Sequence, residues 1–165
     1  MSRPPFDLRS IFCAALLSAV ATLTHQFLNA QKGPVPSAIL ASKTVFVSNV
    51  GPDTEDMSAY VSREPNRVYD DFYTALKNSG KFEIIGDPSD ADLVLEPRVA
   101  NQRDGGAYLT LVIYDRKTHY VLWTLTHRIK GCNSQKACID NFDAAIPGLL
   151  LDLEKLAGKA SPEAH

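Results

Sequence analysis

The 165-residue sequence predicts an α+β fold, a two-layer sandwich in which helices cover one face of a mixed sheet of about five strands. Two observations lead to this prediction. Apolar and polar residues alternate over residues 107–130, as in a hairpin whose sheet is buried on one side. The segments 65–79 and 139–157 instead repeat apolar residues at helical spacing. The predicted order is strand, helix, four strands and helix, within a single domain over residues 43–158.

The predicted hairpin has two different faces, because side chains alternate from one side of a strand to the other. Its turn is the polar stretch 116–119. We expect helices to cover the more apolar face, since a lone hairpin is marginally stable in water. That face is predicted to carry Leu109, Leu111, Ile113, Val121, Trp123, Leu125 and Ile129. The opposite face is predicted to carry Tyr108, Thr110, Val112, Tyr114, Tyr120, Leu122, Thr124, Thr126 and Arg128.

The N-terminal residues 1–30 have the layout of a secretory signal peptide. Two arginines precede an uncharged run over residues 10–28, and the small Ala30 stands before the polar Gln31. We expect cleavage between Ala30 and Gln31, which predicts a periplasmic or secreted protein of a bacterial envelope. The alternative is that the run is retained as a membrane anchor. Residues 31–42 contain two prolines and are predicted to be an extended linker.

Export changes the interpretation of the cysteines, because disulfides form in oxidising compartments. Cys132 and Cys138 remain after loss of the signal peptide, and their spacing predicts a disulfide that closes a small loop. A metal pair and a redox pair are the alternatives. A metal site would need further ligands, and only His127 is close in sequence. A catalytic dithiol more often has two residues between its cysteines.

The first predicted strand covers residues 43–49, and the connection at 50–64 is long and acidic. Connections of this length are often functional or mobile, and the acidic spacing matches no calcium loop. Pro65 suits the first position of the helix at 65–79, and Gly80 suits its end.

Two short strands precede the hairpin, at residues 82–85 and 93–101. The turn between them, 86–92, contains three aspartates, for which we weigh backbone capping against a metal site. Pro97 cannot donate a hydrogen bond to a neighbouring strand, which predicts a bulge or a partial edge position. Residues 102–106 form the turn into the hairpin.

Three positions near the end of the chain carry backbone signals. His119 lies in the hairpin turn where glycine is often used, and histidine tolerates a positive φ better than most residues. We therefore expect a turn role for it. Pro147 and Gly148 predict that the last helix is kinked or divided in two. Gly158 ends it, and the tail 159–165 is predicted to be disordered.

Short motifs over residues 43–157 resemble the envelope α/β domain family of the curli-secretion protein CsgG, the lipoprotein LpoB and the TolB amino-terminal domain. The motifs are the stretches 80–85 and 91–95, then Leu111-x-Ile113-x-Asp115 and Val121-Leu122-Trp123. The chain departs from the family in lacking an evident lipidated cysteine and pore-forming strands, and in carrying His119 instead of glycine. The resemblance therefore implies an adaptor-like domain that acts through protein contacts, and it supplies no catalytic residue.

The function predicted from these observations is a non-enzymatic, protein-binding envelope module. A formal charge of -2 without a basic stripe argues against nucleic-acid binding. Aromatic residues among threonines on the second sheet face are typical of protein interfaces, although such residues also favour strands for their own sake. The candidate partner face comprises Phe46, Tyr108, Tyr114, Tyr120 and Leu122.

Two other functions stay open at this stage, a small-ligand carrier and a hydrolase of envelope polymers. A hydrolase needs a nucleophile with a base, or two placed carboxylates. None of the common hydrolase or phosphate-loop motifs occurs in the sequence. His127 falls on the predicted core-facing side of its strand, and a deep pocket with a carboxylate beside it would favour an enzyme. We predict no catalytic residue, no cofactor and no metal ligand.

Overall fold

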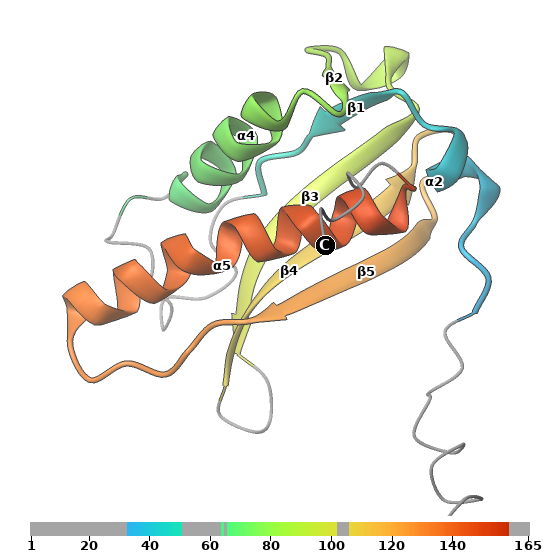
Figure 1. Ribbon diagram of the computed structural model, residues 1–165. Coiled ribbons are helices and arrows are strands. Elements are labelled where there is room, and N and C mark those ends of the chain that lie inside the picture. Colours follow the sequence, from blue (N-terminus) through green and yellow to red (C-terminus); the bar gives the residue numbers. More distant parts are fainter. Residues whose placement is uncertain (1–32, 51–63, 65, 102–105, 159–165) are drawn as a thin grey trace, which may run out of the picture. The chain divides into compact units, whose positions relative to one another are not determined.

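Five strands form one mixed sheet in the described part of the chain, in the order β2-β1-β3-β4-β5 (Figure 1). β1 is parallel to both of its neighbours, whereas β3, β4 and β5 are antiparallel. The computed structural model describes residues 33–50, 64, 66–101 and 106–158. The strands are β1 (Thr44–Val47), β2 (Glu83–Ile84), β3 (Leu93–Asn101), β4 (Ala107–Asp115) and β5 (Val121–Arg128).

Two long helices, α4 (Arg67–Ser79) and α5 (Gln135–Leu156), lie side by side on one face of this sheet (Figure 1). The predicted α+β fold with a mixed five-stranded sheet and helices is thereby confirmed. A short 3₁₀ helix, η2 (Pro88–Asp90), precedes β3. The predicted cleavage between Ala30 and Gln31, most of the acidic connection and the tail 159–165 lie outside the described residues.

α4 follows the predicted apolar pattern but begins at Arg67, after an N-cap at Asn66, so the predicted first position at Pro65 is wrong. Val68, Phe72 and Leu76 recur every four residues and are buried, so one stripe of the helix faces the sheet. Gly80 ends the helix with φ of 62°, a left-handed conformation that glycine adopts without steric penalty. The predicted end at Gly80 is confirmed.

α5 differs from its prediction in two ways. It begins at Gln135 instead of residue 139, because the hydroxyl of Ser134 accepts a hydrogen bond from the Ala137 amide at 3.3 Å and caps the helix. It also continues through Pro147 as one helix, so the predicted division in two is wrong. Phe142 and Leu149, on either side of the proline, are both completely buried. Burial of this stripe offsets the one hydrogen bond that proline removes.

The predicted linker at 31–42 is partly wrong. Residues Ser37–Ala41 form a short helix, α2, and Ile39 within it is 0% exposed in the core. The Ser42 hydroxyl donates to the Ile39 carbonyl oxygen at 2.8 Å and so holds the end of this turn. The segment escapes a pattern-based prediction because one apolar residue between prolines has no periodicity.

The hairpin prediction is correct for β4 and partly wrong for β5. Leu109, Leu111 and Ile113 are 0% exposed, and Trp123 packs against the same core. The pairing skips one residue near the turn, with Ile113 opposite Trp123 and Tyr114 opposite Val121. This bulge moves Val121 to the open side, where it is 54% exposed. The extra residue is Leu122, which packs against the core and not on the open side as predicted.

Pro97 lies partly at an edge, as predicted, but without a bulge. β1 pairs with β3 only from Leu93 to Leu95, whereas β4 pairs with β3 continuously along its length. Pro97 is opposite Leu111 of β4, and Leu111 in turn is opposite Leu125 of β5. Pro97 therefore lies beyond the end of β1, so no residue of β1 needs a hydrogen bond from the amide that proline lacks.

Candidate functional site

The sheet face opposite α4 and α5 is covered by no described helix (Figure 1). β1, β3 and β4 turn alternate side chains toward it. We define the open face by its half-buried apolar residues and its two central charged residues. These are Phe46, Val94, Tyr108, Val112, Tyr114, Glu96 and Arg98.

Glu96 and Arg98 form an ion pair in the middle of this face. Only 8% of Glu96 is exposed, so its carboxylate has lost most of its contact with water. The Tyr114 hydroxyl donates a hydrogen bond to Glu96 Oε1 at 3.2 Å. Burial, and then the negative charge of Glu96, raises the pKa of Tyr114, which keeps the phenol protonated as a donor. The open face thus has a fixed polar centre within an apolar surround.

The residues predicted for the partner face are only partly brought together. Phe46, Tyr108 and Tyr114 lie on the open face and are half-buried. Tyr120 is 74% exposed and lies in the turn before β5. Leu122 is the bulge residue and packs against the core, so it does not belong to this face.

Sequence reasoning missed Glu96 and Arg98 as members of this face. A signal was present, because residues two apart on a strand share one face and these two carry opposite charges. The sequence prediction for this stretch considered only the backbone hydrogen bond that Pro97 cannot donate.

His127 lies on the covered side of β5, as predicted, and is half-buried. Its Nδ1 is 3.4 Å from Asp152 Oδ2 on α5. On α5, Gly148 lies so close that a Cβ there would be 2.4 Å from His127 Cε1. The imidazole therefore lies between the Asp152 carboxylate and the backbone of α5 at Gly148, which has no side chain. Within the described residues it makes no hydrogen bond to a hydroxyl or thiol nucleophile.

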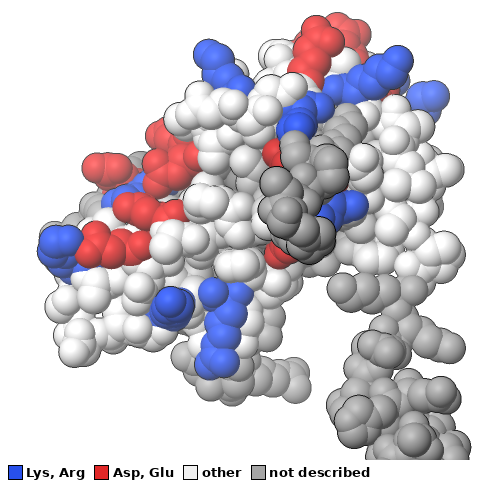
Figure 2. Space-filling model, in the orientation of Figure 1, with Lys and Arg blue, Asp and Glu red and all other residues white. Residues whose placement is uncertain are grey.

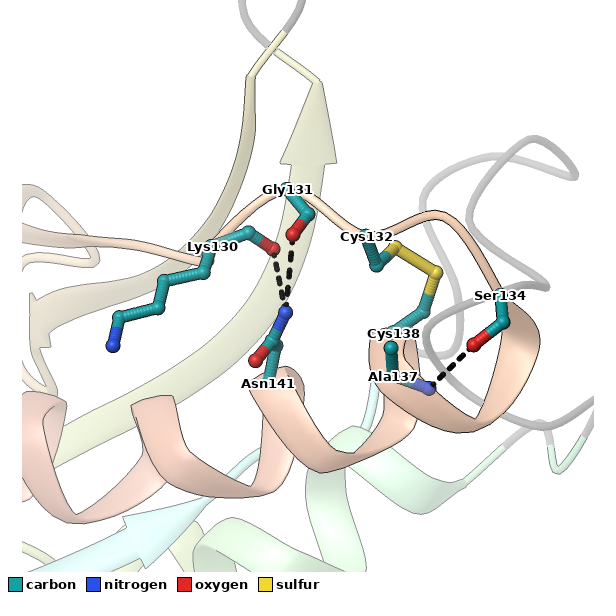
Figure 3. Close-up of a disulfide and its surroundings, with 7 residues drawn as sticks. All are labelled: Lys130, Gly131, Cys132, Ser134, Ala137, Cys138 and Asn141. Carbon is teal, nitrogen blue, oxygen red and sulfur yellow. Dashed lines mark hydrogen bonds between the residues drawn. A yellow bond between two sulfur atoms is a disulfide. The ribbon is translucent and has the colours of Figure 1, made fainter.

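Cys132 and Cys138 form the predicted disulfide, with a Cα–Cα distance of 5.0 Å (Figure 3). The bond connects the loop after β5 to the first turn of α5. Just beyond it, the Asn141 side chain donates to the carbonyl oxygens of Lys130 and Gly131, at 3.3 and 3.2 Å (Figure 3). These contacts fix the position at which α5 enters the covering layer.

Asp87 and Asp92, two of the three aspartates in the turn before β3, bind backbone groups. Asp92 Oδ2 accepts hydrogen bonds from the amides of Lys43 and Thr44, at 2.8 and 3.0 Å, and these bonds lower the pKa of Asp92. Asp87 accepts from the Ser89 amide at 2.8 Å and caps η2. Among the described residues, no three His, Cys, Asp or Glu side chains are grouped as a metal site would require.

His119 has φ of 58°, so its predicted turn role is confirmed. Its amide donates to the Asp115 carbonyl oxygen at 2.9 Å, while the Asp115 carboxylate accepts from the Thr118 amide at 2.7 Å. The latter bond lowers the pKa of Asp115. The histidine therefore serves the geometry of the β4–β5 turn.

The helical layer has a more acidic surface than the open face. Red side chains gather over the left part of α4 and α5 in Figure 2. There Arg67 bridges the two helices, with distances of 3.1 Å to Asp71 and 2.6 Å to Asp143. Burial raises the pKa of Asp71 in spite of this cation. A hollow of about 340 Å³ beside the bridge is lined by both aspartates and by Pro147.

No family model matches the sequence, and no curated protein matches it. Solved structures show a partial likeness, and three of them illustrate it. PelC from Paraburkholderia phytofirmans, described as a dodecamer, has 16% identity over 79% of this chain and 94% of that chain, with a TM-score of 0.47. XCC0632 from Xanthomonas campestris, of family model DUF330, has 12% identity over 78% and 86%, with a TM-score of 0.46. A putative neuraminyllactose-binding hemagglutinin homolog from Helicobacter pylori has 14% identity over 70% and 85%, with a TM-score of 0.35.

These likenesses concern the fold alone, and we base no functional argument on them. None of the three is named as a CsgG, LpoB or TolB protein. The predicted relation to that family therefore stays a prediction. Along the described residues, no helix combines the length and the apolar character of a membrane span.

Proposed function

We propose that this chain is an exported, non-enzymatic envelope domain that binds another envelope protein through the open face of its sheet. The composition of that face supports the proposal most directly. Tyr108, Tyr114 and Arg98 belong to the residue types that contribute most binding energy in protein interfaces. Phe46 and the two valines add apolar area around them.

The charges of the open face indicate the chemistry of the partner. Glu96 and Arg98 neutralise each other, and the other residues that define the open face are uncharged, while Arg128 of β5, opposite Tyr108, adds an exposed cation at its margin. A highly charged polymer would find little to pair with here. A folded protein with an apolar, hydrogen-bonding surface suits the face better, because interface centres are depleted of charged residues.

The arrangement of His127 supports a structural role over a catalytic one. A base needs a nucleophile within hydrogen-bond reach. His127 instead contacts Asp152 on one side and Gly148 on the other. The hollow between α4 and α5 has a different lining, with two aspartates and no histidine.

The proposal is tested by affinity capture from the native envelope with the full chain and two variants. Tyr114→Ala removes an aromatic ring and the donor to Glu96 on the open face. Tyr73→Ala is the matched control, because Tyr73 is half-buried on α4 in the opposite layer. We expect the Tyr114→Ala variant to capture at least about tenfold less of a partner protein than the Tyr73→Ala variant captures. Equal retention by both variants would refute the proposal.

A further inference from the structure

We propose that the edge strand β5 (Val121–Arg128) binds an extended segment of a partner protein that carries acidic side chains, which adds a sixth strand to the sheet. This surface differs from the open face, because it consists of backbone groups at the rim of the sheet. The inference rests on three observations: the direction of the β5 backbone groups, their exposure, and the charge around the strand.

The hydrogen bonding of β5 shows which of its backbone groups point outward. The Ile129 amide donates to the Ala107 carbonyl oxygen at 2.9 Å. Bonded and non-bonded pairs alternate along an antiparallel ladder, so His127 and Leu125 also bond to β4. The N–H and C=O groups of the residues between them point away from β4. Those residues are Thr124, Thr126 and Arg128.

The same three residues have exposed side chains, and no other described element donates a backbone hydrogen bond to them. β5 is eight residues long and contains no proline. Such an edge is a template for another strand. The opposite edge differs, because β2 has only two residues and offers hardly any ladder.

Positive charge lies at the C-terminal end of this edge. Residues 116–139 include five Lys or Arg side chains and no Asp or Glu, although the whole chain has a net charge of -2. Arg128 and Lys130 lie at the end of β5, whereas Arg116 donates to the Ala91 carbonyl oxygen before β3 and so points away from this edge. In Figure 2, blue side chains lie along the lower margin, near the place where β5 ends in Figure 1. A partner segment with carboxylates near the end that meets Arg128 and Lys130 would match this group.

A second copy of this chain matches the edge less well. Antiparallel pairing of two β5 strands with Thr124 opposite Thr126 aligns their faces and their outward backbone groups. That pairing places Arg128 opposite Leu122 of the second copy and brings no β5 carboxylate to it, since β5 has no acidic residue. Charge therefore favours an acidic segment of a different protein.

The test uses the full chain, labelled for amide NMR, and two synthetic peptides of about eight residues with the same alternating Val-Thr centre. One peptide has Asp and Glu at both ends, and the other has Lys there. We expect the acidic peptide to bind at least about fivefold more tightly than the basic one. Hydrogen exchange at the Thr124 and Thr126 amides should slow when it binds, because these donors become paired.

Thr126→Pro removes an outward amide without removing a β4 hydrogen bond, and we expect it to weaken peptide binding by about tenfold or more. Thr126→Ala keeps the amide and should bind within about twofold of the unaltered chain. Arg128→Glu should reverse the preference between the two peptides. If Thr126→Pro does not fold, the peptide preference of Arg128→Glu and the hydrogen exchange of the Thr124 and Thr126 amides test the inference.

Several results would overturn the inference. One is that neither peptide binds, and another is that both peptides bind equally. A third is a dimer of this chain that Thr126→Pro converts to a monomer, which would assign the edge to a second copy. Tyr114→Ala should leave peptide binding unchanged, so failure at the edge and failure at the open face are distinguishable.

Discussion

The two faces of the sheet use the same strands in different ways. On β4, Leu111 and Ile113 are 0% exposed beneath the helices, whereas Val112 and Tyr114, which alternate with them, are half-buried on the other side. Both sets are suited to strands, so residue type alone does not separate them. The helices make the difference, because they exclude water from one set only. The covered face contributes the completely buried side chains, and the open face is the surface that we propose for recognition.

The largest contrast is expected between neighbours on β4. Leu111→Ala removes a completely buried side chain and should lower the free energy of unfolding by about 2–5 kcal/mol. Val112→Ala, one residue along the strand, should lower it by about 1 kcal/mol or less. Urea denaturation of both variants measures the difference. Similar losses would show that the open face is covered as well.

Gly148→Ala tests the contact between the covering helix and β5. A Cβ at this position would lie within 2.4 Å of His127 Cε1, so the ring or the helix must move. We expect a loss of about 1–3 kcal/mol. Combining it with His127→Ala should recover part of that loss in thermal unfolding, because the opposing ring is gone. An additive double variant would contradict the proposed clash.

The disulfide should contribute to the free energy of unfolding but not to partner binding at the open face. Replacing Cys132 and Cys138 together by serine should lower the free energy of unfolding by about 2 kcal/mol, the value expected for so short a loop. Partner binding at the open face should be unchanged, since the bond lies beside α5. Loss of capture with intact folding would connect the two sides and contradict this separation.

Tyr114→Phe isolates one hydrogen bond on the open face. The variant keeps the ring and removes the donor to Glu96, so we expect a loss of about 0.5–1.5 kcal/mol. The control is Tyr120→Phe, for which the change should be smaller because Tyr120 is 74% exposed in the turn. Equal effects in urea denaturation would place the stabilisation elsewhere.

The smallest expected effect is the contribution of Asp92 in acid. Its folded-state pKa lies below the ordinary value of about 3.9, because the amides of Thr44 and Lys43 bind the carboxylate. Its contribution to stability is therefore complete above about pH 4 and is lost as pH falls through the lowered pKa. Asp92→Asn should flatten this acid decline in urea midpoints measured against pH. An unchanged decline would assign it to other carboxylates.

Local patterns were sufficient for much of the fold. The helical spacing of Val68, Phe72 and Leu76 predicted the buried stripe of α4, and Gly80 predicted its end. The short spacing of Cys132 and Cys138 predicted their bond. Each of these signals involves residues close together in sequence.

The errors concern features that depend on distant packing. The bulge before Trp123 moves Val121 to the open side and Leu122 toward the core, because one extra residue reverses the alternation. Ile39 is buried only because the distant strands form a core for it. Of the candidate site, the sequence predicted Phe46, Tyr108 and Tyr114. It did not single out Glu96 and Arg98, although two opposite charges two residues apart on one strand were a local signal for their pairing.

The most direct test of the account is site-specific photocrosslinking in the native envelope. The photoreactive amino acid p-benzoylphenylalanine would replace Tyr108 on the open face in one sample and Tyr73 on α4 in another. The account predicts a discrete larger adduct with a second protein from position 108 and none from position 73. Adducts only from position 73, or none from either position, would contradict the claim that the open face is the recognition surface.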